Sequence, residues 1–244
     1  MRELSKSISR RLADSNFIRR YFVGDGVDVG GGPDPLALYA EFFPLMRSLR
    51  IWDLQDGDAQ FMEGVPDGAF DFLTSSHCLE HLHDPAEGLA NWFRVVRPGG
   101  YLVIMVPDED LFEQGQFPST FNRDHKHTFT IQKSISWSER SLNVLDLVHG
   151  LGPAARLEKV ELLTSSYRFD LPRLDQTLTP VGEAAIEFII RKASAAEAQS
   201  GVRERIVSQP SPTLRRYYNQ YRRDHESLKR LNVGEPPFQD EGEL

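Results

Sequence analysis

Residues 26–33, Gly26-Val27-Asp28-Val29-Gly30-Gly31-Gly32-Pro33, are the stretch of this 244-residue chain that most restricts its fold. A short β-rich run that passes directly into glycines is typical of a buried parallel strand ending in a tight turn. Similar short apolar runs occupy residues 50–53, 70–74 and 101–106. Asp84 is a good N-cap for a helix between the last two runs. This alternation predicts a parallel sheet with helices on both faces.

The rest of the chain gives a domain plan around this sheet. Two late strands, at 159–163 and 184–191, predict one antiparallel strand at the edge of an otherwise doubly wound, Rossmann-like α/β sheet. Helices are predicted over residues 35–49 and 134–151, and the polar segment 108–130 is expected to be a functional loop. In chain order, we expect an N-terminal helix over 1–20, a cofactor-binding domain over 21–192, a helical extension over 193–232, and a disordered tail over 233–244.

Composition limits the class of protein. Hydrophobic residues make up 40% of the chain, as in a folded globular protein. The single cysteine, Cys78, cannot form an internal disulfide. We find no run of about 18 apolar residues that would span a membrane, and no apolar secretion signal, so we expect a cytoplasmic protein. The net charge is −8, with basic residues gathered in 1–20 and 203–230. That distribution argues against a dedicated nucleic-acid binder.

Four polar segments follow the predicted strands, where ligands bind in such sheets. Glycines let the backbone approach a ligand closely, and Asp28 can accept hydrogen bonds from an amine. Asp53 can bind a ribose, whereas Asp58 and the Ala59 amide match the edge of adenine. Taken singly, these motifs could be a plain glycine turn, a loop cap and an Asp-Gly turn. Together they predict one cavity that contains all three aspartates.

The fourth segment is residues 70–82, FDFLTSSHCLEHL, followed by residues 94–101, RVVRPGGY. With the strand-end motifs, these segments resemble the class I S-adenosylmethionine (SAM) dependent methyltransferases over roughly residues 24–192. The resemblance implies SAM as the cofactor. Its implied contacts are Asp28, Gly30 and Gly32 at the methionine part, Asp53 at the ribose, Asp58 and Ala59 at the adenine, and Ser76 and His77 beneath the sulfonium.

Two departures from known cofactor motifs stand out. Asp34 occupies a position where the family often has another glycine, and the spacing from Gly32 to Asp53 is short, so the first helix is clipped. The sequence therefore does not define how the protein surrounds the carboxylate of the cofactor. The G-x-G-x-x-G fingerprint of dinucleotide-binding folds is also incomplete, because Pro33 and Pro35 follow the glycines. The chain is therefore not expected to bind NAD.

Candidate catalytic residues fall in two clusters. His77, Glu80 and His81 have the spacing of one helical face; they either pack together or hold a divalent ion, and we assign no metal ligand. In the loop, His125 next to Asp124 is either a general base with a tuned pKa or part of a polar lid. The predicted catalytic residues are thus His77, His81, Asp124 and His125.

The acceptor is less defined than the cofactor. Residues 117–122 and 124–126 resemble a bacterial methyltransferase subgroup associated with surface-glycan synthesis, which implies a sugar hydroxyl as acceptor. We therefore expect O-methylation of a sugar or another small metabolite. Residues 215–223 mix arginines with tyrosines, which is suited to RNA, an anionic glycan carrier or a partner. The alternatives are an RNA or protein methyltransferase that docks through this helix, and a non-catalytic SAM-binding protein; a homo-oligomer is left open.

Overall fold

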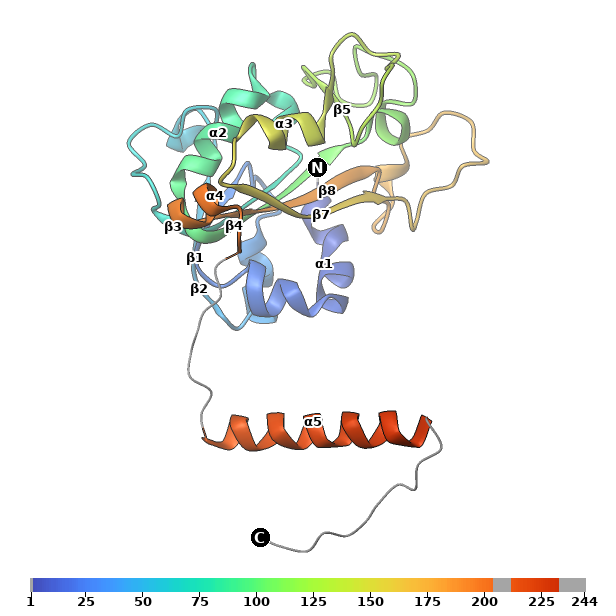
Figure 1. Ribbon diagram of the computed structural model, residues 1–244. Helices are drawn as coiled ribbons and strands as arrows, with labels where there is room; N and C mark the ends of the chain where they lie inside the picture. The colour runs from blue at the N-terminus through green and yellow to red at the C-terminus, as the bar shows by residue number, and fades with distance from the viewer. Residues whose placement is uncertain (1, 204–211, 233–244) are drawn as a thin grey trace, which may run out of the picture. The chain divides into compact units, whose positions relative to one another are not determined.

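The computed structural model describes residues 2–203 and 212–232. The chain divides into two compact units, Met1–Arg203 and Glu204–Leu244. The first contains the sheet (Figure 1), and the described part of the second is one helix, α5 (Pro212–Asn232). The disordered tail expected over 233–244 lies outside the described residues. Among the helices described, none combines the length and the apolar character that crossing a bilayer requires.

A six-stranded sheet with the order β2-β1-β3-β4-β8-β7 forms the centre of the first unit. The strands are β1 (Gly24–Val29), β2 (Met46–Trp52), β3 (Phe70–Ser76), β4 (Val96–Pro107), β7 (Ala155–Leu163) and β8 (Ala185–Lys192). β1 to β4 are parallel, and β8 runs antiparallel to both of its neighbours. The predicted fold class is confirmed. The antiparallel strand, β8, is fifth in the spatial order of the sheet and not at its edge, because β7 pairs with its outer side.

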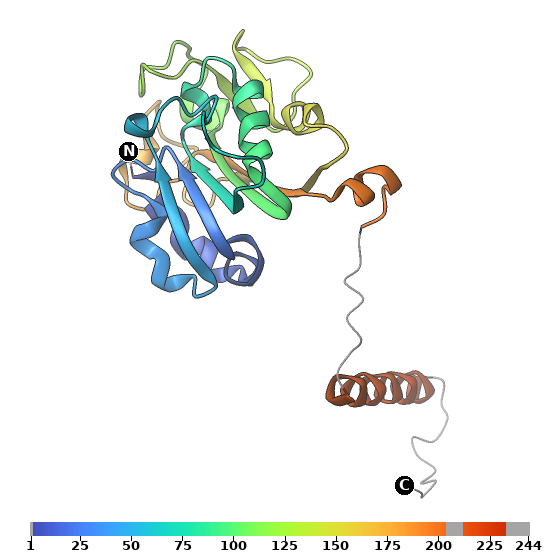
Figure 2. The ribbon, with the colours of Figure 1, turned by 90° about the vertical axis from the view of Figure 1, so that its left-hand side faces the viewer.

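Helices cover both faces of this sheet (Figures 1 and 2). One face packs on α2 (Pro85–Val95) and α3 (Val144–Gly150), and the other on α1 (Glu3–Ala13). Successive residues of a strand point to opposite faces, so Phe72 joins the α1 layer and Leu73 the α2 layer. Both faces are buried, which explains why residues 102–106 of β4 are all apolar.

Three predicted helices are shorter than expected. The first ends at Ala13 and is followed by a separate helical turn, Phe17–Tyr21. Residues 35–49 form only a 3-10 helix, Leu36–Phe42, before β2 begins, since Pro44 cannot continue it. In the segment 134–151 only α3 is helical. Its serine hydroxyls bind elsewhere instead: Ser136 and Ser141 both donate to Glu109, a competition that disfavours helix.

The remaining elements complete the edge at the carboxyl ends of the strands. They are the short helices Leu54–Asp56, Leu79–His81, Glu109–Glu113 and Gln176–Leu178, and the two-stranded ribbon of β5 (Thr128–Thr130) and β6 (Ser141–Asn143). The helix α4 (Ala195–Ser200) lies at the opposite edge, because it follows β8, which runs antiparallel to β4. The division into an N-terminal helix, a cofactor domain and an extension stays a prediction; in the structure α1 and α4 belong to the same compact unit as the sheet.

A buried ion pair fixes α1 beneath this edge. The Arg11 guanidinium lies 2.9 Å from a Glu187 carboxylate oxygen on β8, and neither side chain is exposed. Burial alone would raise the pKa of Glu187, but Arg11 and Arg10 outweigh it and hold that pKa below its usual value. The first residues of α1 are thereby brought to the end of the sheet where β1 and β3 stop.

Candidate cofactor and acceptor site

The end of β1 turns on a glycine that no other residue could replace without a shift of its neighbours. Gly30 has φ +76°, and a Cβ added there would lie 2.7 Å from both Cβ and Sγ of Cys78. The absence of a side chain lets the loop after β1 touch the loop after β3. This contact, which we call the glycine corner, brings the first and fourth predicted segments together.

Asp28 supplies a buried carboxylate just before this corner. One of its oxygens accepts the Leu36 amide at 2.7 Å, and the other finds no hydrogen-bond partner among the described residues. Desolvation raises the pKa of Asp28 to about 7, because it outweighs the Leu36 amide and Arg11. The hydroxyl of Ser76, at the end of β3, is likewise buried and unpartnered within the described chain. The free oxygen of Asp28 and the Ser76 hydroxyl are therefore two buried polar atoms that a polar ligand would satisfy.

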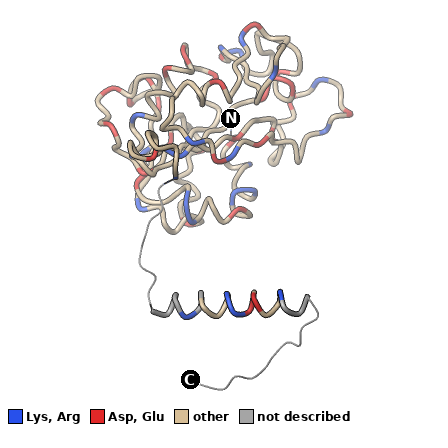
Figure 3. The backbone as a smooth tube through the Cα atoms, viewed as in Figure 1, with Lys and Arg blue, Asp and Glu red and all other residues tan. Residues whose placement is uncertain are grey.

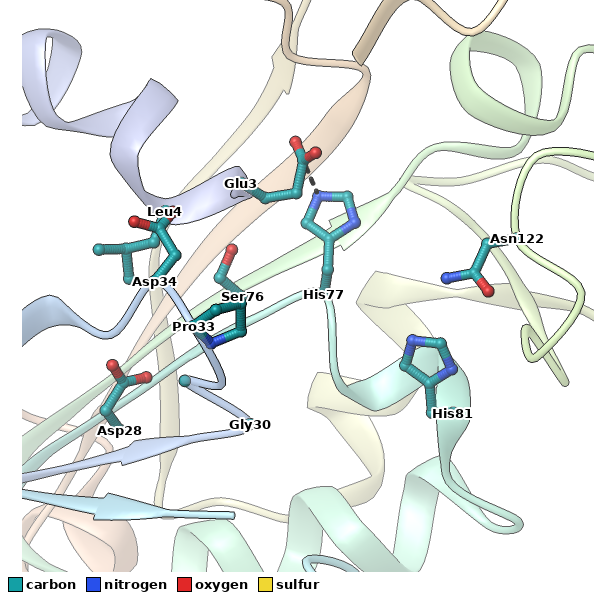
Figure 4. Close-up of a pocket in the computed structure, with 11 residues that line it drawn as sticks. Glu3, Leu4, Asp28, Gly30, Pro33, Asp34, Ser76, His77, His81 and Asn122 are labelled. Atoms are coloured by element: carbon teal, nitrogen blue, oxygen red, sulfur yellow. Dashed lines mark ion pairs between the residues drawn. The ribbon is translucent and has the colours of Figure 1, made fainter. Parts of the chain in front are cut away.

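Asp34, the residue in place of a family glycine, has a structural task. Its carboxylate accepts the Ser5 amide in the first turn of α1 at 2.8 Å and the Tyr39 hydroxyl at 3.1 Å. A carboxylate at this position satisfies an N-terminal amide and complements the helix dipole. The departure from the motif therefore ties α1 to the glycine corner, with Glu3 and Leu4 beside the predicted methionine contacts (Figure 4).

The predicted ribose and adenine contacts follow β2. Asp53 caps the helix Leu54–Asp56 with one oxygen, which accepts the Leu54 amide at 2.8 Å. Its other oxygen lies 3.9 Å from the Cβ position of Gly32. Asp58 is exposed and accepts the Gln60 amide at 2.8 Å. The Ala59 amide donates to no described residue, whereas its carbonyl accepts the Trp92 indole. The Ala59 amide beside the Asp58 carboxylate is the donor and acceptor pair expected for the edge of adenine.

The three aspartates do not line one cavity, so that prediction was wrong as stated. Asp28 lines a corner cavity of about 140 Å³, and Asp53 and Asp58 line a strand-end cavity of about 410 Å³. The two cavities are neighbours, because Gly30 and His81 line both of them. The Gly30 turn lies between the ends of β1 and β2 and divides the space.

His77 lines the corner cavity from the β3 side. Its φ is +53°, which is uncommon for a residue with a side chain. Its Nδ1 lies 3.4 Å from Glu80 and its Nε2 4.0 Å from Glu3 of α1 (Figure 4). Burial disfavours the imidazolium, but Glu80 and Glu3 outweigh it, so the pKa of His77 is above its usual value.

The predicted pairing of Asp124 with His125 is wrong. Asp124 contacts His81 instead, at 2.9 Å from its Nδ1, and His125 contacts Glu113 at 2.6 Å. The chain is not helical there, and the two neighbouring side chains diverge. The Lys126 amide and ammonium donate to the carbonyls of Glu80 and His81. These bonds hold the loop against the turn after β3, so both predicted catalytic clusters form one group.

Sequence reasoning missed two members of this group. Glu113 belongs to the short helix Glu109–Glu113 and is buried against His125, but it lies twelve residues away in the chain with no recognisable spacing. Asn122 lines the corner cavity opposite His77 and His81 (Figure 4). It is part of the Asn122-Arg123-Asp124-His125 run, so its position in a loop after β4 was the available signal.

A third, larger cavity opens on the other side of the loop. This loop cavity has a volume of about 880 Å³ and contains the side of His125 away from the corner. It shares His83 and Lys126 with the strand-end cavity. Its lining combines cationic, imidazole and aromatic side chains, among them Arg123, Arg140, His127, Phe117 and Trp137. Such a lining suits a polar molecule with hydroxyl or anionic groups.

The basic C-terminal segment is a single helix in its own unit. The described side chains of α5 include exposed Arg216, Arg222 and Arg223, and Tyr221 is 69% exposed. Figure 3 shows the basic positions spread along the helix together with acidic ones. Its role in docking stays a prediction.

Comparison with known proteins adds an independent finding. Residues 4–145 match a family model described as a methyltransferase domain. A protein of Mycolicibacterium smegmatis named "Probable S-adenosylmethionine-dependent methyltransferase" is 35% identical over 21% of this chain and 20% of its own length. An uncharacterized methyltransferase of Schizosaccharomyces pombe is 30% identical over 37% of this chain and 27% of its own. The chain thus spans less than a third of each of these curated relatives. The solved SAM-dependent methyltransferase of Archaeoglobus fulgidus is 17% identical with a TM-score of 0.47, covering 79% of this chain and 95% of that one.

Proposed function

This chain belongs to the methyltransferase domain family, whose methyl donor is S-adenosylmethionine, and we propose that it methylates a hydroxyl group of a sugar or of another small metabolite. The observation that carries the proposal is the glycine corner with its two unpartnered buried atoms, Asp28 Oδ1 and Ser76 Oγ. Buried polar atoms in native proteins nearly always have a partner. A ligand with hydrogen-bond donors at this corner would supply it.

The residues around the corner fit the shape and charge of the donor. Asp28 would accept a hydrogen bond from the ammonium of its methionine part, and Asp53 would accept from the ribose. Asp58 and the Ala59 amide would bind the adenine edge in the strand-end cavity. The bound donor supplies an electrophilic methyl group, so that the task left to the protein is to position the acceptor and exclude water.

The lining of the acceptor side supports an oxygen acceptor. A hydroxyl must lose its proton when it is methylated, and imidazoles are the usual proton acceptors in proteins. His77 and His81 both line the corner cavity, so a hydroxyl placed there has an imidazole within reach. Asn122, which lines the same cavity, offers an amide that can orient a second hydroxyl of a sugar.

The loop cavity supports a sugar over a purely apolar metabolite. It is within the size range of ligand sites, about 300–1,000 Å³, and its polar and aromatic side chains match the hydroxyls and the apolar face of a pyranose. Arg123 and Arg140 would also accommodate a phosphate attached to the sugar.

Two measurements test the proposal in order. Calorimetry with S-adenosylhomocysteine (SAH) tests the cofactor assignment, and absence of binding would refute it. Incubation with radiolabelled SAM and a panel of sugars, nucleotide sugars and RNA then tests the acceptor. We expect label on a sugar-containing acceptor. Label on RNA, with binding that weakens steeply as salt rises, would replace the sugar proposal. SAH binding with no transfer to any acceptor would favour a non-catalytic protein.

A further inference from the structure

Two histidines from different segments direct the same ring atom at one carboxylate. Nε2 of His81 lies 3.9 Å from Glu80 Oε1, and Nε2 of His125 lies 3.7 Å from the same oxygen. One ligand atom from each of the three residues lies within 4.8 Å of the others. The rings are 5.1 Å apart and nearly perpendicular, so they do not stack. These separations are somewhat wider than those around a bound ion.

The other nitrogen of each ring is held by a second carboxylate. Nδ1 of His81 lies 2.9 Å from Asp124, and Nδ1 of His125 lies 2.6 Å from Glu113. A carboxylate at Nδ1 fixes the tautomer in which Nδ1 carries the proton and Nε2 presents a lone pair. Histidines that bind metals in proteins almost always have such a partner behind them. The same arrangement occurs twice here, and both lone pairs point toward Glu80.

The facing atoms have one more imidazole beside them, since Nδ1 of His77 lies 3.4 Å from the same Glu80 oxygen. The side chains of Glu80 and His125 are fully buried, and neither Glu80 oxygen nor His125 Nε2 has a hydrogen-bond partner among the described residues. Leaving a buried polar group unsatisfied costs about 1–3 kcal/mol, and more when the group is charged. The group therefore contains a buried carboxylate with two uncommitted imidazole nitrogens beside it.

We propose that Glu80, His81 and His125 bind one divalent transition-metal ion. Two imidazoles and one carboxylate are a ligand set that suits Zn²⁺ and its neighbours, whereas Mg²⁺ prefers oxygen ligands and water. Three protein ligands leave a coordination position for a further group. Of the three ligands, His81 lines both the corner and the strand-end cavities.

The ion would connect the two catalytic clusters. Glu80 and His81 belong to the turn after β3, and His125 belongs to the loop after β4. If the proposed methyltransferase function holds, the ion would supply Lewis acidity at this edge of the sheet. The metal site itself does not depend on that function, since it rests on the ligand geometry alone.

Metal analysis of the purified full-length chain, without a histidine tag, tests the proposal directly. After chelation, titration with Zn²⁺ should show one tight site per chain, and Co²⁺ at that site should give the visible absorption of a coordinated ion. Mg²⁺ should not compete at equal concentration. A chain that binds neither Zn²⁺ nor Co²⁺ at micromolar concentration would overturn the inference, whatever happens with SAH.

Variants then locate the site. His81→Ala, His125→Ala and Glu80→Gln should each abolish tight Zn²⁺ binding, and Asp124→Asn should weaken it about 10–100-fold by removing the carboxylate behind His81. The matched control is His127→Ala, in the same loop, whose ring contacts the His83 carbonyl; it should bind Zn²⁺ like the parent. Retained SAH binding establishes that each variant is folded. Zn²⁺ affinity in the His81→Ala and Glu80→Gln variants equal to that of His127→Ala would show that the ion binds elsewhere.

The metal and methyl-transfer experiments fail independently. SAH binding and methyl transfer by a chain that binds neither Zn²⁺ nor Co²⁺ would remove the metal proposal and leave the function. Stoichiometric Zn²⁺ binding without methyl transfer would leave the metal proposal and count against the proposed function.

Discussion

The glycine corner and the loop of residues 108–143 meet at the same edge of the sheet, but different forces hold them. At the corner the position of the chain is set by backbone shape, since Gly30 leaves no room for even one added carbon beside Cys78. In the loop, position is set by charged side chains that reach across the sequence, such as His125 to Glu113 and Lys133 to Glu109. We therefore expect substitutions that add atoms to disrupt the corner, and substitutions that remove a charged side chain to disrupt the loop.

The strongest way to break this comparison is Gly30→Ala. The new Cβ would collide with Cys78 at a positive φ, and we expect the free energy of unfolding to fall by about 2–4 kcal/mol with loss of SAH binding. Urea denaturation measures the first effect and calorimetry the second. Gly115→Ala is the control, because Gly115 has φ +81° with no atom within 4 Å of an added Cβ. Equal destabilisation of both variants would show that the contact with Cys78 is unimportant.

Asp58→Ala tests whether the strand-end cavity holds the adenine. Loss of a charged hydrogen bond should weaken SAH binding by about 1.5–3 kcal/mol, which is roughly 10–150-fold. Calorimetry gives the affinity, and Asp67→Ala, an exposed aspartate outside the cavities, serves as the control. Unchanged affinity in the Asp58 variant would refute the adenine assignment.

His125→Ala sharpens the comparison from the loop side. It removes a group of the acceptor side, so turnover should fall by about 10–100-fold while SAH affinity stays the same. Steady-state methyl transfer and calorimetry separate the two quantities, with His149→Ala, an exposed histidine of α3 outside the three cavities, as the reference. Turnover equal to that of the parent would exclude His125 from the mechanism. A loss of SAH affinity as large as the loss of turnover would show that the loop and the glycine corner do not act separately.

The smallest expected effect is a pH dependence at the corner. The pKa of Asp28 is about 7 in the ligand-free protein, and only its ionised form suits a cationic ammonium. SAH affinity should therefore rise with pH up to about 7 and then level, by at most tenfold, or about 1.4 kcal/mol, per pH unit. Arg11, Asp34 and Asp53 act on the same carboxylate, so Asp28→Asn is the needed control. A slope that survives in Asp28→Asn would assign it to another group.

Sequence alone predicted the corner better than the loop, for a physical reason. Strand runs and the glycine turn are local signals, and β1, β3 and β4 lie where their apolar runs placed them. The helix expected over 134–151 failed because serines that read as helix-compatible bind Glu109 more than twenty residues away. The partner of His125 was misassigned because adjacency suggested Asp124, while only the folded loop brings Glu113 to the ring.

The sole cysteine lies against Gly30, and burial raises the pKa of its thiol to about 12. Because thiolates are the reactive form, alkylating reagents should modify Cys78 very slowly at neutral pH while the strand ends stay in contact. The labelling rate of Cys78 therefore reports how often this part of the molecule opens, and no probe has to be added to the chain. Comparing the rates with the cavity empty and occupied would show how far a ligand slows that opening.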